Sequence, residues 1–361
     1  MKSEKDFSVE FCVFCHEDTK AQSPTKSFSY KKTGKKSAYS RFFTGCVKIY
    51  LYMNLMQLHL YLTIVEENFK IFLDNLTEFN YILIKHQHNP KLQEANMKKI
   101  HLLIIDPQRD FCDPDGALSV TGADRDMERL AALTDRIGDN LWDIHCTLDT
   151  HHYFDISHPI FWMDANRNHP APFTIISRAD VENGIWRATN PQYQAYVLDY
   201  VGRLETNKRY PLCIWPPHCL IGTKGHNVAP VLADAILRWE KKQIGMVDYV
   251  TKGSNYKTEH YSAVQADVPD PSDPSTMLNS RLIRTLEEAD EILLAGEALS
   301  HCLKFTVEDI ADTFDEKHIR KMVLVEDCAS PVPGFEQQGR DFVSNMKARG
   351  MQVSTSADYH P

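Results

Sequence analysis

Four short apolar runs of this chain are each followed by a side chain that can do chemistry. These residues are Asp106, the pair Asp149 and His151, Lys252, and Cys302. In parallel α/β sheets, ligands bind beyond the carboxyl ends of the strands, where residues at such positions meet. A carboxylate, a carboxylate–imidazole pair, an ammonium and a thiol at one edge predict a site for acid–base, nucleophilic or metal chemistry.

Cys302 stands where a helix is expected to begin, directly after the segment 296–301. The free N–H groups and positive dipole end of a helix lower the pKa of a thiol, favour the thiolate and can hold an oxyanion. Asp106 is then a candidate proton acceptor, and Lys252 between them would keep that carboxylate ionised. Ordinary alternatives stay open, because most cysteines only pack, an aspartate can cap a turn, and most lysines lie in solvent.

A second group of residues has the types that bind transition metals. Asp149 and His151 are two positions apart, so in an extended segment both side chains point the same way. In Trp215-Pro-Pro-His218-Cys219, two prolines fix the backbone around His218, which is a candidate third ligand, and His158 is a candidate fourth. Two or three imidazoles with one carboxylate suit zinc, iron or manganese, although Asp-x-His alone often arises by chance.

These residues need a parallel sheet to bring them together, and the chain from Met97 has the pattern of one. Apolar runs alternate with segments whose apolar residues recur at helical spacing. The stretch 153–227 breaks this alternation and is expected to form loops and short helices over one end of the sheet. The predicted fold class is α/β, a parallel sheet with helices on both faces. Strands are expected at 100–105, 142–148, 245–250, 291–296, 321–327 and 352–356, and helices at 124–137, 228–242, 303–314 and about 335–349.

Composition divides the chain near Met97. The 361 residues have a net charge of −9, but residues 1–96 sum to +3 and residues 97–361 to −12. We predict two parts, an N-terminal extension (1–96) and a folded domain (97–361). The extension is either dispensable or the result of a start assigned too early. The acidic balance argues against nucleic acid as the main partner.

The extension carries two patterns that we interpret as incidental. The stretch 47–65 is apolar, but polar residues interrupt it, so a membrane span is not expected. Cys12-Val-Phe-Cys15-His16 matches the haem-attachment pattern, and a chance match is favoured. The start of the chain is not typical of a secretory signal. Nine cysteines in 361 residues are too few for a disulfide-rich scaffold, which indicates free thiols and predicts a cytoplasmic protein.

From about Met97 onward, the chain resembles the nicotinamidase/pyrazinamidase branch of the isochorismatase-like cysteine hydrolases. The resemblance covers nearly all of residues 97–361 and none of the first 96. Trp-Pro-Pro-His-Cys is its most discriminating motif. Five motifs occur in the family's order: Asp106-Pro-Gln108-Arg-Asp-Phe111-Cys-Asp, Asp149-Thr-His151, Trp215-Pro-Pro-His218-Cys219, Thr251-Lys252-Gly253, and Gly296-Glu-Ala298-Leu-Ser-His-Cys302.

The resemblance implies a Rossmann-like three-layer α/β/α hydrolase domain and a role for each matched residue. Cys302 would be the nucleophile, Asp106 its base and Lys252 the third member of a triad. The N–H groups of Ala298 and Cys302 would form an oxyanion hole, with a cis peptide between Glu297 and Ala298. The implied metal ligands are Asp149, His151 and His218, with His158 as an optional fourth. Phe111 and Trp215 would sandwich a flat ring, and Gln108 would support the site from behind.

The implied reaction is hydrolysis of nicotinamide to nicotinate and ammonia through a thioester on Cys302, in the salvage of NAD. It would use one divalent metal ion (zinc, iron or manganese). The partners would be small molecules rather than nucleic acid or a membrane, and the chain could form a homo-oligomer. Two alternatives stay open: a related cysteine hydrolase acting on another amide, a carbamoyl group or isochorismate, and a silent binding protein.

Three features depart from the family pattern. Ser300 stands where the family often has Asp. Ser157 stands where four-ligand members have a histidine, and His158 comes one residue later. The segment 153–210 is longer than in compact bacterial members, which bears on the substrate more than on the chemistry.

Overall fold

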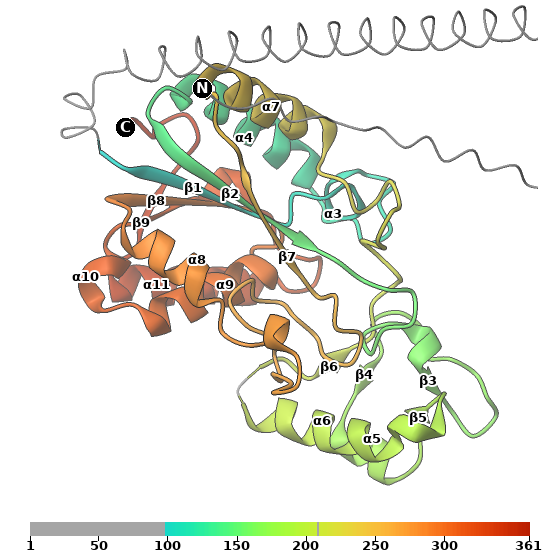
Figure 1. Cartoon of the computed structure of the whole chain (residues 1–361). Coiled ribbons are helices and arrows are strands. Elements are labelled where there is room, and N and C mark those ends of the chain that lie inside the picture. The colour runs from blue at the N-terminus through green and yellow to red at the C-terminus, as the bar shows by residue number, and fades with distance from the viewer. Residues whose placement is uncertain (1–97, 208) are drawn as a thin grey trace, which may run out of the picture. The chain divides into compact units, whose positions relative to one another are not determined.

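The structure is a computed structural model that describes residues 98–207 and 209–361. Six parallel strands form one sheet in the order β10-β9-β8-β1-β2-β7 (Figure 1). The strands are β1 (Ile100–Ile105), β2 (Leu141–Asp149), β7 (Asp248–Lys252), β8 (Glu291–Gly296), β9 (Met322–Val325) and β10 (Gln352–Ser354). All six residues of β1 are buried, as expected for a central strand that is covered on both faces.

Helices cover both faces of the sheet, which confirms the predicted α/β class. Two helices contact each other on one face, and three lie on the other (Figure 1). The first pair is α4 (Ala123–Ile137) and α7 (Pro230–Gln243); the others are α8 (Ser280–Glu287), α9 (Cys302–Thr313) and α11 (Glu336–Arg349). The short helices are α3 (Arg109–Cys112) and α10 (Glu316–Ile319). In α4, the buried residues Met127, Leu130 and Thr134 recur at the spacing of one helical face.

The stretch 153–227 has more regular structure than was predicted. Two small antiparallel pairs form, β3 with β5 and β4 with β6, and Figure 1 shows the stretch beyond the ends of β2 and β7. Its own apolar cluster includes Phe161, Trp162 and Tyr200. Strands of two residues carry no periodic signal, which is why the sequence did not reveal them. The elements are β3 (Trp162–Met163), β4 (Ile175–Ile176), β5 (Arg187–Ala188), β6 (Leu212–Cys213), α5 (Arg178–Glu182) and α6 (Gln194–Thr206).

Two further differences concern β7 and α8. The strand predicted at 245–250 lies at Asp248–Lys252, so Lys252 is its last residue. Met246, just before this edge strand, and Tyr249, within it, are exposed apolar residues. The apolar run in the sequence therefore begins before the strand does. Helix α8 was not predicted, although its apolar residues Leu282, Ile283 and Leu286 do recur at helical spacing.

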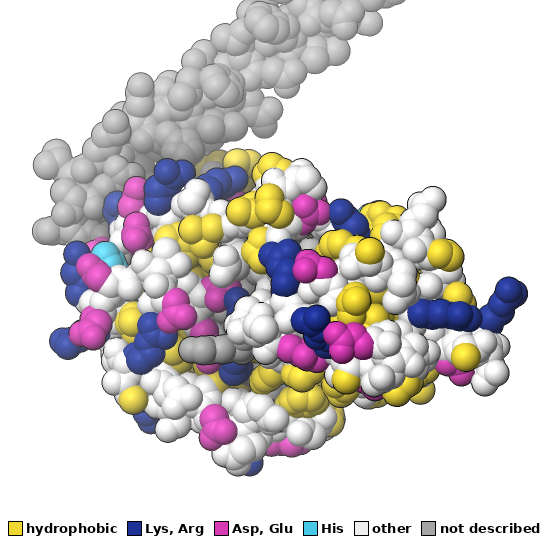
Figure 2. Space-filling view, turned by 90° about the horizontal axis from the view of Figure 1, so that it is seen from below, with side chains coloured by type: hydrophobic (Ala, Val, Ile, Leu, Met, Phe, Trp, Pro, Cys, Tyr) yellow, Lys and Arg dark blue, Asp and Glu magenta, His cyan; other side chains and the backbone are white. Residues whose placement is uncertain are grey.

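The predictions for the extension 1–96, the apolar stretch 47–65 and the Cys12–His16 pattern lie outside the described residues. In the described part of the chain, no helix has both the length and the apolar character needed to cross a membrane. The six cysteines there are free thiols. Figure 2 shows acidic and basic side chains interspersed among apolar ones on one face. The cytoplasmic location stays a prediction.

Candidate active site

The ends of three neighbouring strands and the start of one helix meet at the carboxyl edge of the sheet. Asp106 follows β1, Asp149 ends β2, Lys252 ends β7, and Cys302 is the first residue of α9. All four side chains are buried. The structure therefore brings together the residues that the sequence predicted would meet.

Lys252 lies at the centre of this group. Its Nζ is 2.9 Å from Asp106 Oδ2, 2.9 Å from Asp149 Oδ1, and 2.9 Å from the carbonyl oxygen of His260. The sulfur of Cys302 lies 3.6 Å from the same nitrogen. An ammonium has three N–H donors, and three oxygens surround this one, so its position is fixed.

The charges of Lys252 and Asp149 follow from their mutual contact. Burial alone would lower the pKa of Lys252, but Asp106 and Asp149 outweigh burial and raise that pKa well above its usual range. Burial alone would raise the pKa of Asp149, but His151 and Lys252 outweigh it and hold that pKa well below its usual range. Both side chains are therefore charged at neutral pH.

The pKa of the Cys302 thiol is shifted in the direction opposite to the one that the sequence predicted. Burial raises its pKa well above the usual range, although Lys252 acts in the opposite direction. The sequence predicted a lowered pKa at this helix N-terminus, but a fully buried sulfur loses the hydration that stabilises a thiolate. The resting thiol keeps its proton, so any nucleophilic attack needs a base beside it.

Asp106 is the carboxylate in position to act as that base. Burial raises its pKa, and Lys252 lowers it in part. Its Oδ1 accepts a hydrogen bond of 2.5 Å from the hydroxyl of Thr147. Its other oxygen, Oδ2, lies 2.9 Å from the Nζ of Lys252. A hydrogen bond with Asp106 is among the causes that keep the thiol of Cys302 protonated.

The loop between β8 and α9 presents two backbone N–H groups beside the sulfur. The peptide bond between Glu297 and Ala298 is cis, as the resemblance implied. Among the residues that the structure describes, no group accepts from the N–H of Ala298 or of Cys302. Two free N–H groups next to a thiol are what an oxyanion hole requires.

The three implied metal ligands also lie together. Asp149 Oδ2 is 3.0 Å from His151 Nε2 and 3.4 Å from His218 Nε2. The ligand atoms all lie within 4.8 Å of one another, and the side chains are buried. Ligand atoms around a tetrahedral zinc ion are about 3.3 Å apart, since each bond is about 2.0 Å.

Hydrogen bonds orient the two imidazoles toward a metal. Nδ1 of His151 lies 3.1 Å from Asp155 Oδ2, and Nδ1 of His218 lies 2.9 Å from the carbonyl oxygen of Pro216. An oxygen acceptor keeps a hydrogen on Nδ1 of each ring, so a metal ion that displaces the proton from Nε2 would bind at that nitrogen. The donor set therefore fits one divalent ion.

His158 lies beside this set but outside it. Its Nε2 is 3.4 Å from Nδ1 of His218, which is the nitrogen turned away from Asp149. Its own Nδ1 is 3.1 Å from the carbonyl oxygen of His152. The fourth-ligand role of His158 stays a prediction.

Gln108 holds the backbone of Asp149 from both sides. Its Nε2 donates to the carbonyl oxygen of Asp149 at 2.7 Å, and its Oε1 accepts from the Asp149 N–H at 2.7 Å. The amide also donates to the carbonyl oxygen of His226 at 3.0 Å. Gln108 thus fixes the strand end that carries the shared carboxylate.

A small cavity of about 30 Å³ lies beside Cys302. Phe111 and Trp215, the two predicted ring-binding residues, both line it. The Trp215 indole N–H donates to the hydroxyl of Tyr261 at 3.1 Å. A small, mainly apolar cavity with a few polar groups is typical of a site for a small molecule. Its lining residues are Phe111, Leu118, Val120, Asp149, Trp215, His218, Glu259, Tyr261, Ala298, His301, Cys302 and Val332.

Several solved structures are similar to this chain at low identity and with TM-scores below 0.5. The nicotinamidase/pyrazinamidase of Acinetobacter baumannii is 20% identical, covers 73% of this chain and 99% of its own, and gives a TM-score of 0.49. The yeast nicotinamidase bound to nicotinaldehyde is 18% identical, with 71% and 99% covered and a TM-score of 0.49. The Pyrococcus horikoshii pyrazinamidase in complex with zinc is 17% identical, with 71% and 99% covered and a TM-score of 0.44.

No protein-family model matches the sequence, and no curated protein matches it either. What the molecule does is inferred below from its own side chains.

Sequence reasoning missed four residues of the site. Thr147 precedes Asp149 by two positions on β2, so strand alternation puts it on the same face and could have found it. Asp155, Glu259 and Tyr261 lie in irregular segments, where no pattern singles them out. Burial raises the pKa of Glu259 to about 8, so this cavity-lining carboxyl is neutral at neutral pH.

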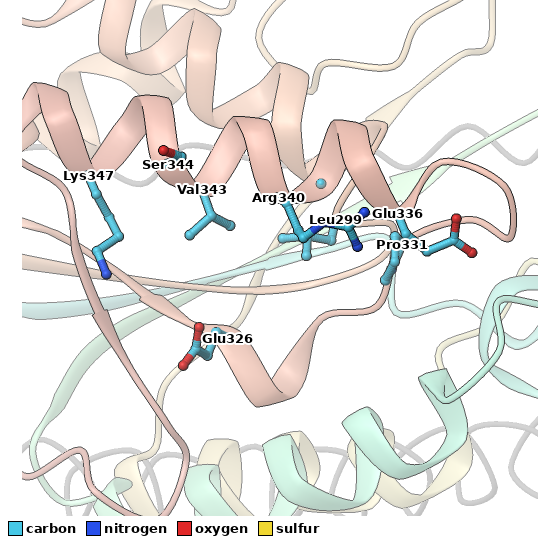
Figure 3. Close-up of a pocket in the computed structure, with 9 residues that line it drawn as sticks. Leu299, Glu326, Pro331, Glu336, Arg340, Val343, Ser344 and Lys347 are labelled. Atoms are coloured by element: carbon cyan, nitrogen blue, oxygen red, sulfur yellow. The ribbon is translucent and has the colours of Figure 1, made fainter.

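A larger groove lies along α11 (Figure 3). It shares no lining residue with the cavity at Cys302, and its charged side chains are of both signs: Glu326, Glu336, Arg340 and Lys347. Its lining contains neither a thiol nor an imidazole. Size alone therefore does not identify the reactive site in this molecule.

Proposed function

We propose that residues 97–361 form a metal-dependent cysteine amidohydrolase that converts nicotinamide to nicotinate and ammonia. One observation carries the proposal. The thiol of Cys302 and the carboxylate of Asp106 lie around the ammonium of Lys252, and Cys302 lines a cavity that aromatic rings also line.

The chemistry follows from the protonation states. Asp106 accepts the proton of the Cys302 thiol as the sulfur attacks the carboxamide carbon, and Lys252 stabilises the negative charge on both groups. The N–H groups of Ala298 and Cys302 hold the oxyanion that forms. Asp106 then gives its proton to the nitrogen, ammonia leaves, and a thioester remains. Water hydrolyses the thioester to the acid and restores the thiol.

The metal ligands in this proposal are Asp149, His151 and His218. A zinc, iron or manganese ion held there would supply a Lewis acid at the wall of the cavity. Asp149 contributes one carboxylate oxygen to Lys252 and the other to the imidazoles, so it couples the two halves of the site. Gln108 keeps that carboxylate in place through the backbone of Asp149.

The aromatic residues favour a flat heterocyclic amide as substrate. Phe111 and Trp215 offer apolar ring surfaces to a pyridine ring, and the neutral Glu259 offers a hydrogen-bond donor. A small amide of this kind is held in a single orientation, which brings its carbonyl carbon to the sulfur. The longer segment 153–210 leaves a related amide or carbamoyl compound as the alternative substrate.

The test is ammonia release from nicotinamide by the purified full-length chain. We expect release by the wild-type chain and a loss of about 10⁴-fold or more in Cys302→Ala. Cys328→Ala is the matched control, because Cys328 is also a buried free thiol but does not line the cavity. Equal rates in the wild type and Cys302→Ala would refute a cysteine mechanism. No release from nicotinamide, with release from another amide, would move the proposal to a related substrate.

Metal removal tests the second half of the proposal. Dialysis against a chelator should abolish ammonia release, and zinc, iron or manganese should restore it. His218→Ala should lower both the metal content and the activity, because it removes one of three ligands. His360→Gln, which alters an exposed histidine, should change neither. Full activity in a chain shown by elemental analysis to be metal-free would contradict metal dependence.

A further inference from the structure

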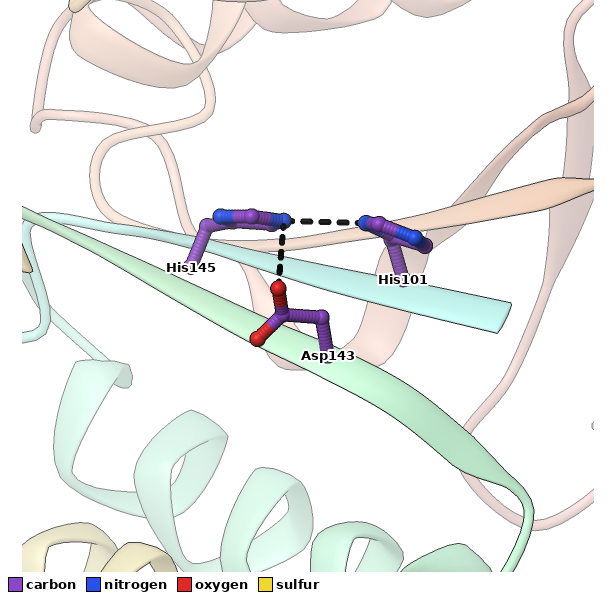
Figure 4. A group of neighbouring side chains, drawn as sticks. All are labelled: His101, Asp143 and His145. Carbon is purple, nitrogen blue, oxygen red and sulfur yellow. Dashed lines mark hydrogen bonds and ion pairs between the residues drawn. The ribbon is translucent and has the colours of Figure 1, made fainter. Parts of the chain in front are cut away.

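A second group of metal-ligand types lies elsewhere on the sheet, on β1 and β2 (Figure 4). We propose that His101, Asp143 and His145 form a second binding site for a divalent transition metal of the zinc type. This cluster shares no residue with the site described above and plays no part in the reaction proposed there.

The register of the strands puts the three side chains on one face. His101 on β1 is paired with Asp143 on β2, and His145 follows Asp143 by two positions. The cluster therefore spans two adjacent strands and is built on rigid elements. Asp143 and His145 lie six and four positions before Asp149, so the cluster lies about 13 to 20 Å along β2 from the catalytic edge.

The distances suit a metal. His101 Nδ1 lies 2.9 Å from His145 Nε2, and His145 Nε2 lies 3.9 Å from Asp143 Oδ2. All three ligand atoms are within 4.8 Å of one another. These values lie on either side of the roughly 3.3 Å between ligand atoms of a tetrahedral zinc ion, so side-chain shifts of about 0.5 to 1.5 Å would close the site.

The neighbour of His145 orients it as a ligand. Its Nδ1 lies 3.1 Å from Asp248 Oδ2 on β7, and Asp248 is held in turn by Arg281 of α8 at 2.9 Å. A carboxylate only accepts hydrogen bonds, so the hydrogen lies on Nδ1 and the lone pair of Nε2 faces the cluster. A carboxylate behind an imidazole is the arrangement that metal-binding histidines commonly have.

Asp143 would give the cluster a negatively charged ligand, and it lies on the side of the cluster from which an ion would enter. Its Oδ1 accepts from the N–H of Ile144 at 2.9 Å, which leaves Oδ2 free for a metal. Its side chain is 31% exposed, whereas that of His145 is 1% exposed. An ion would thus reach two buried imidazoles past a carboxylate at the surface, and water would complete its coordination.

Cobalt(II) binding to the chelator-stripped full chain tests the proposal. Equilibrium dialysis should give two equivalents for the wild type, one for His218→Ala and one for Asp143→Asn. The double variant should bind none. Asp143→Asn should keep its ammonia release, because Asp143 is remote from the cavity. Asp139→Asn, a matched change at an exposed carboxylate in the turn before β2, should bind two equivalents. Cobalt(II) should also raise the unfolding temperature of His218→Ala by a few degrees.

Three outcomes decide between the explanations. One equivalent in the wild type and none in His218→Ala would overturn the second site and leave a hydrogen-bonded histidine pair. Two equivalents in both Asp143→Asn and His101→Gln would overturn it as well. One equivalent that survives in His218→Ala and disappears in Asp143→Asn would support this site while refuting the metal proposed at the cavity. Because His218→Ala leaves the sheet untouched, its result is decisive even if His101→Gln does not fold.

Discussion

At the scale of single residues, Lys252 determines how the site works. It is the cation between two buried carboxylates and a thiol, and it lowers the pKa of each of those three groups. Without it, Asp106 and Asp149 would face each other in a low-dielectric interior, where like charges cannot both persist.

The change Lys252→Met tests this dependence. Lys252 lowers the pKa of both Asp106 and Cys302, so its loss should raise both values further. A protonated Asp106 cannot accept the thiol proton, so kcat/KM should fall by about 10²- to 10⁴-fold. The pH profile of iodoacetamide alkylation at Cys302 should move to higher pH.

Lys257→Met is the control for this change, because Lys257 pairs with Asp270 in the following loop and does not line the cavity. It should keep the wild-type rate and alkylation profile. An unchanged alkylation profile in Lys252→Met would contradict the assignment of Lys252 as the group that tunes the thiol.

At the scale of elements, the approach of β8 to β1 places the reactive loop. Gly296 ends β8 with a φ of +107°, and a Cβ there would lie 2.1 Å from the carbonyl oxygen of Ile105. Only glycine allows this contact, which brings the loop with Ala298 and Cys302 next to Asp106.

The change Gly296→Ala should therefore be costly. We expect a loss of about 2–4 kcal/mol in the free energy of unfolding, from the backbone clash and the positive φ together. Urea denaturation measures the stability, and ammonia release should also fall as the N–H of Ala298 moves.

Gly184→Ala is the matched control, because Gly184 has a φ of +69° but nothing within 4 Å of its Cβ position. It should cost only about 1 kcal/mol, from the positive φ alone. Equal losses in the two variants would show that the contact with Ile105 does not matter.

At the scale of the whole molecule, stability is tied to buried imidazoles that must stay neutral. Burial lowers the pKa of His260 and of His301 to about 3, and that of His101 to about 4. In the unfolded chain, these groups titrate near 6.5. At these three positions, the folded chain excludes protons that the unfolded chain takes up.

The pH dependence of unfolding follows from this difference. Above pH 6.5, the imidazoles are neutral in both states and cost nothing. As the pH falls below 6.5, the unfolded chain binds protons and the folded chain does not, which costs about 2 kcal/mol per imidazole at pH 5. Buried carboxyls whose pKa is raised, such as Glu259 and Asp267, stabilise the fold as the pH falls over the same range, so the contribution of one imidazole is measured by comparing variants.

Circular dichroism melts of wild type, His301→Gln and His360→Gln check this explanation. His301→Gln should show a smaller loss between pH 7 and pH 5, by about 2 kcal/mol, whatever its stability at pH 7. His360 is exposed, so its variant should follow the wild type. Parallel curves for His301→Gln and the wild type would show that this imidazole does not set the slope.

The sequence by itself determined the α/β class and the residues that meet at the sheet edge. Strand and helix periods are local, and parallel strands bring their carboxyl ends to one side, so Asp106, Asp149, Lys252 and Cys302 could be placed from the chain alone. The two-residue strands within 153–227 could not, because they depend on contacts between distant segments.

Only the tertiary structure decided the protonation of the thiol and the second histidine cluster. The pKa of Cys302 depends on burial, which no local pattern reports, so the helix N-terminus alone gave the wrong direction. His101 and His145 are 44 residues apart and meet through the register of β1 on β2. Spacing along the chain limits which residues can be neighbours on one element, whereas packing decides which elements touch and how much water remains between them.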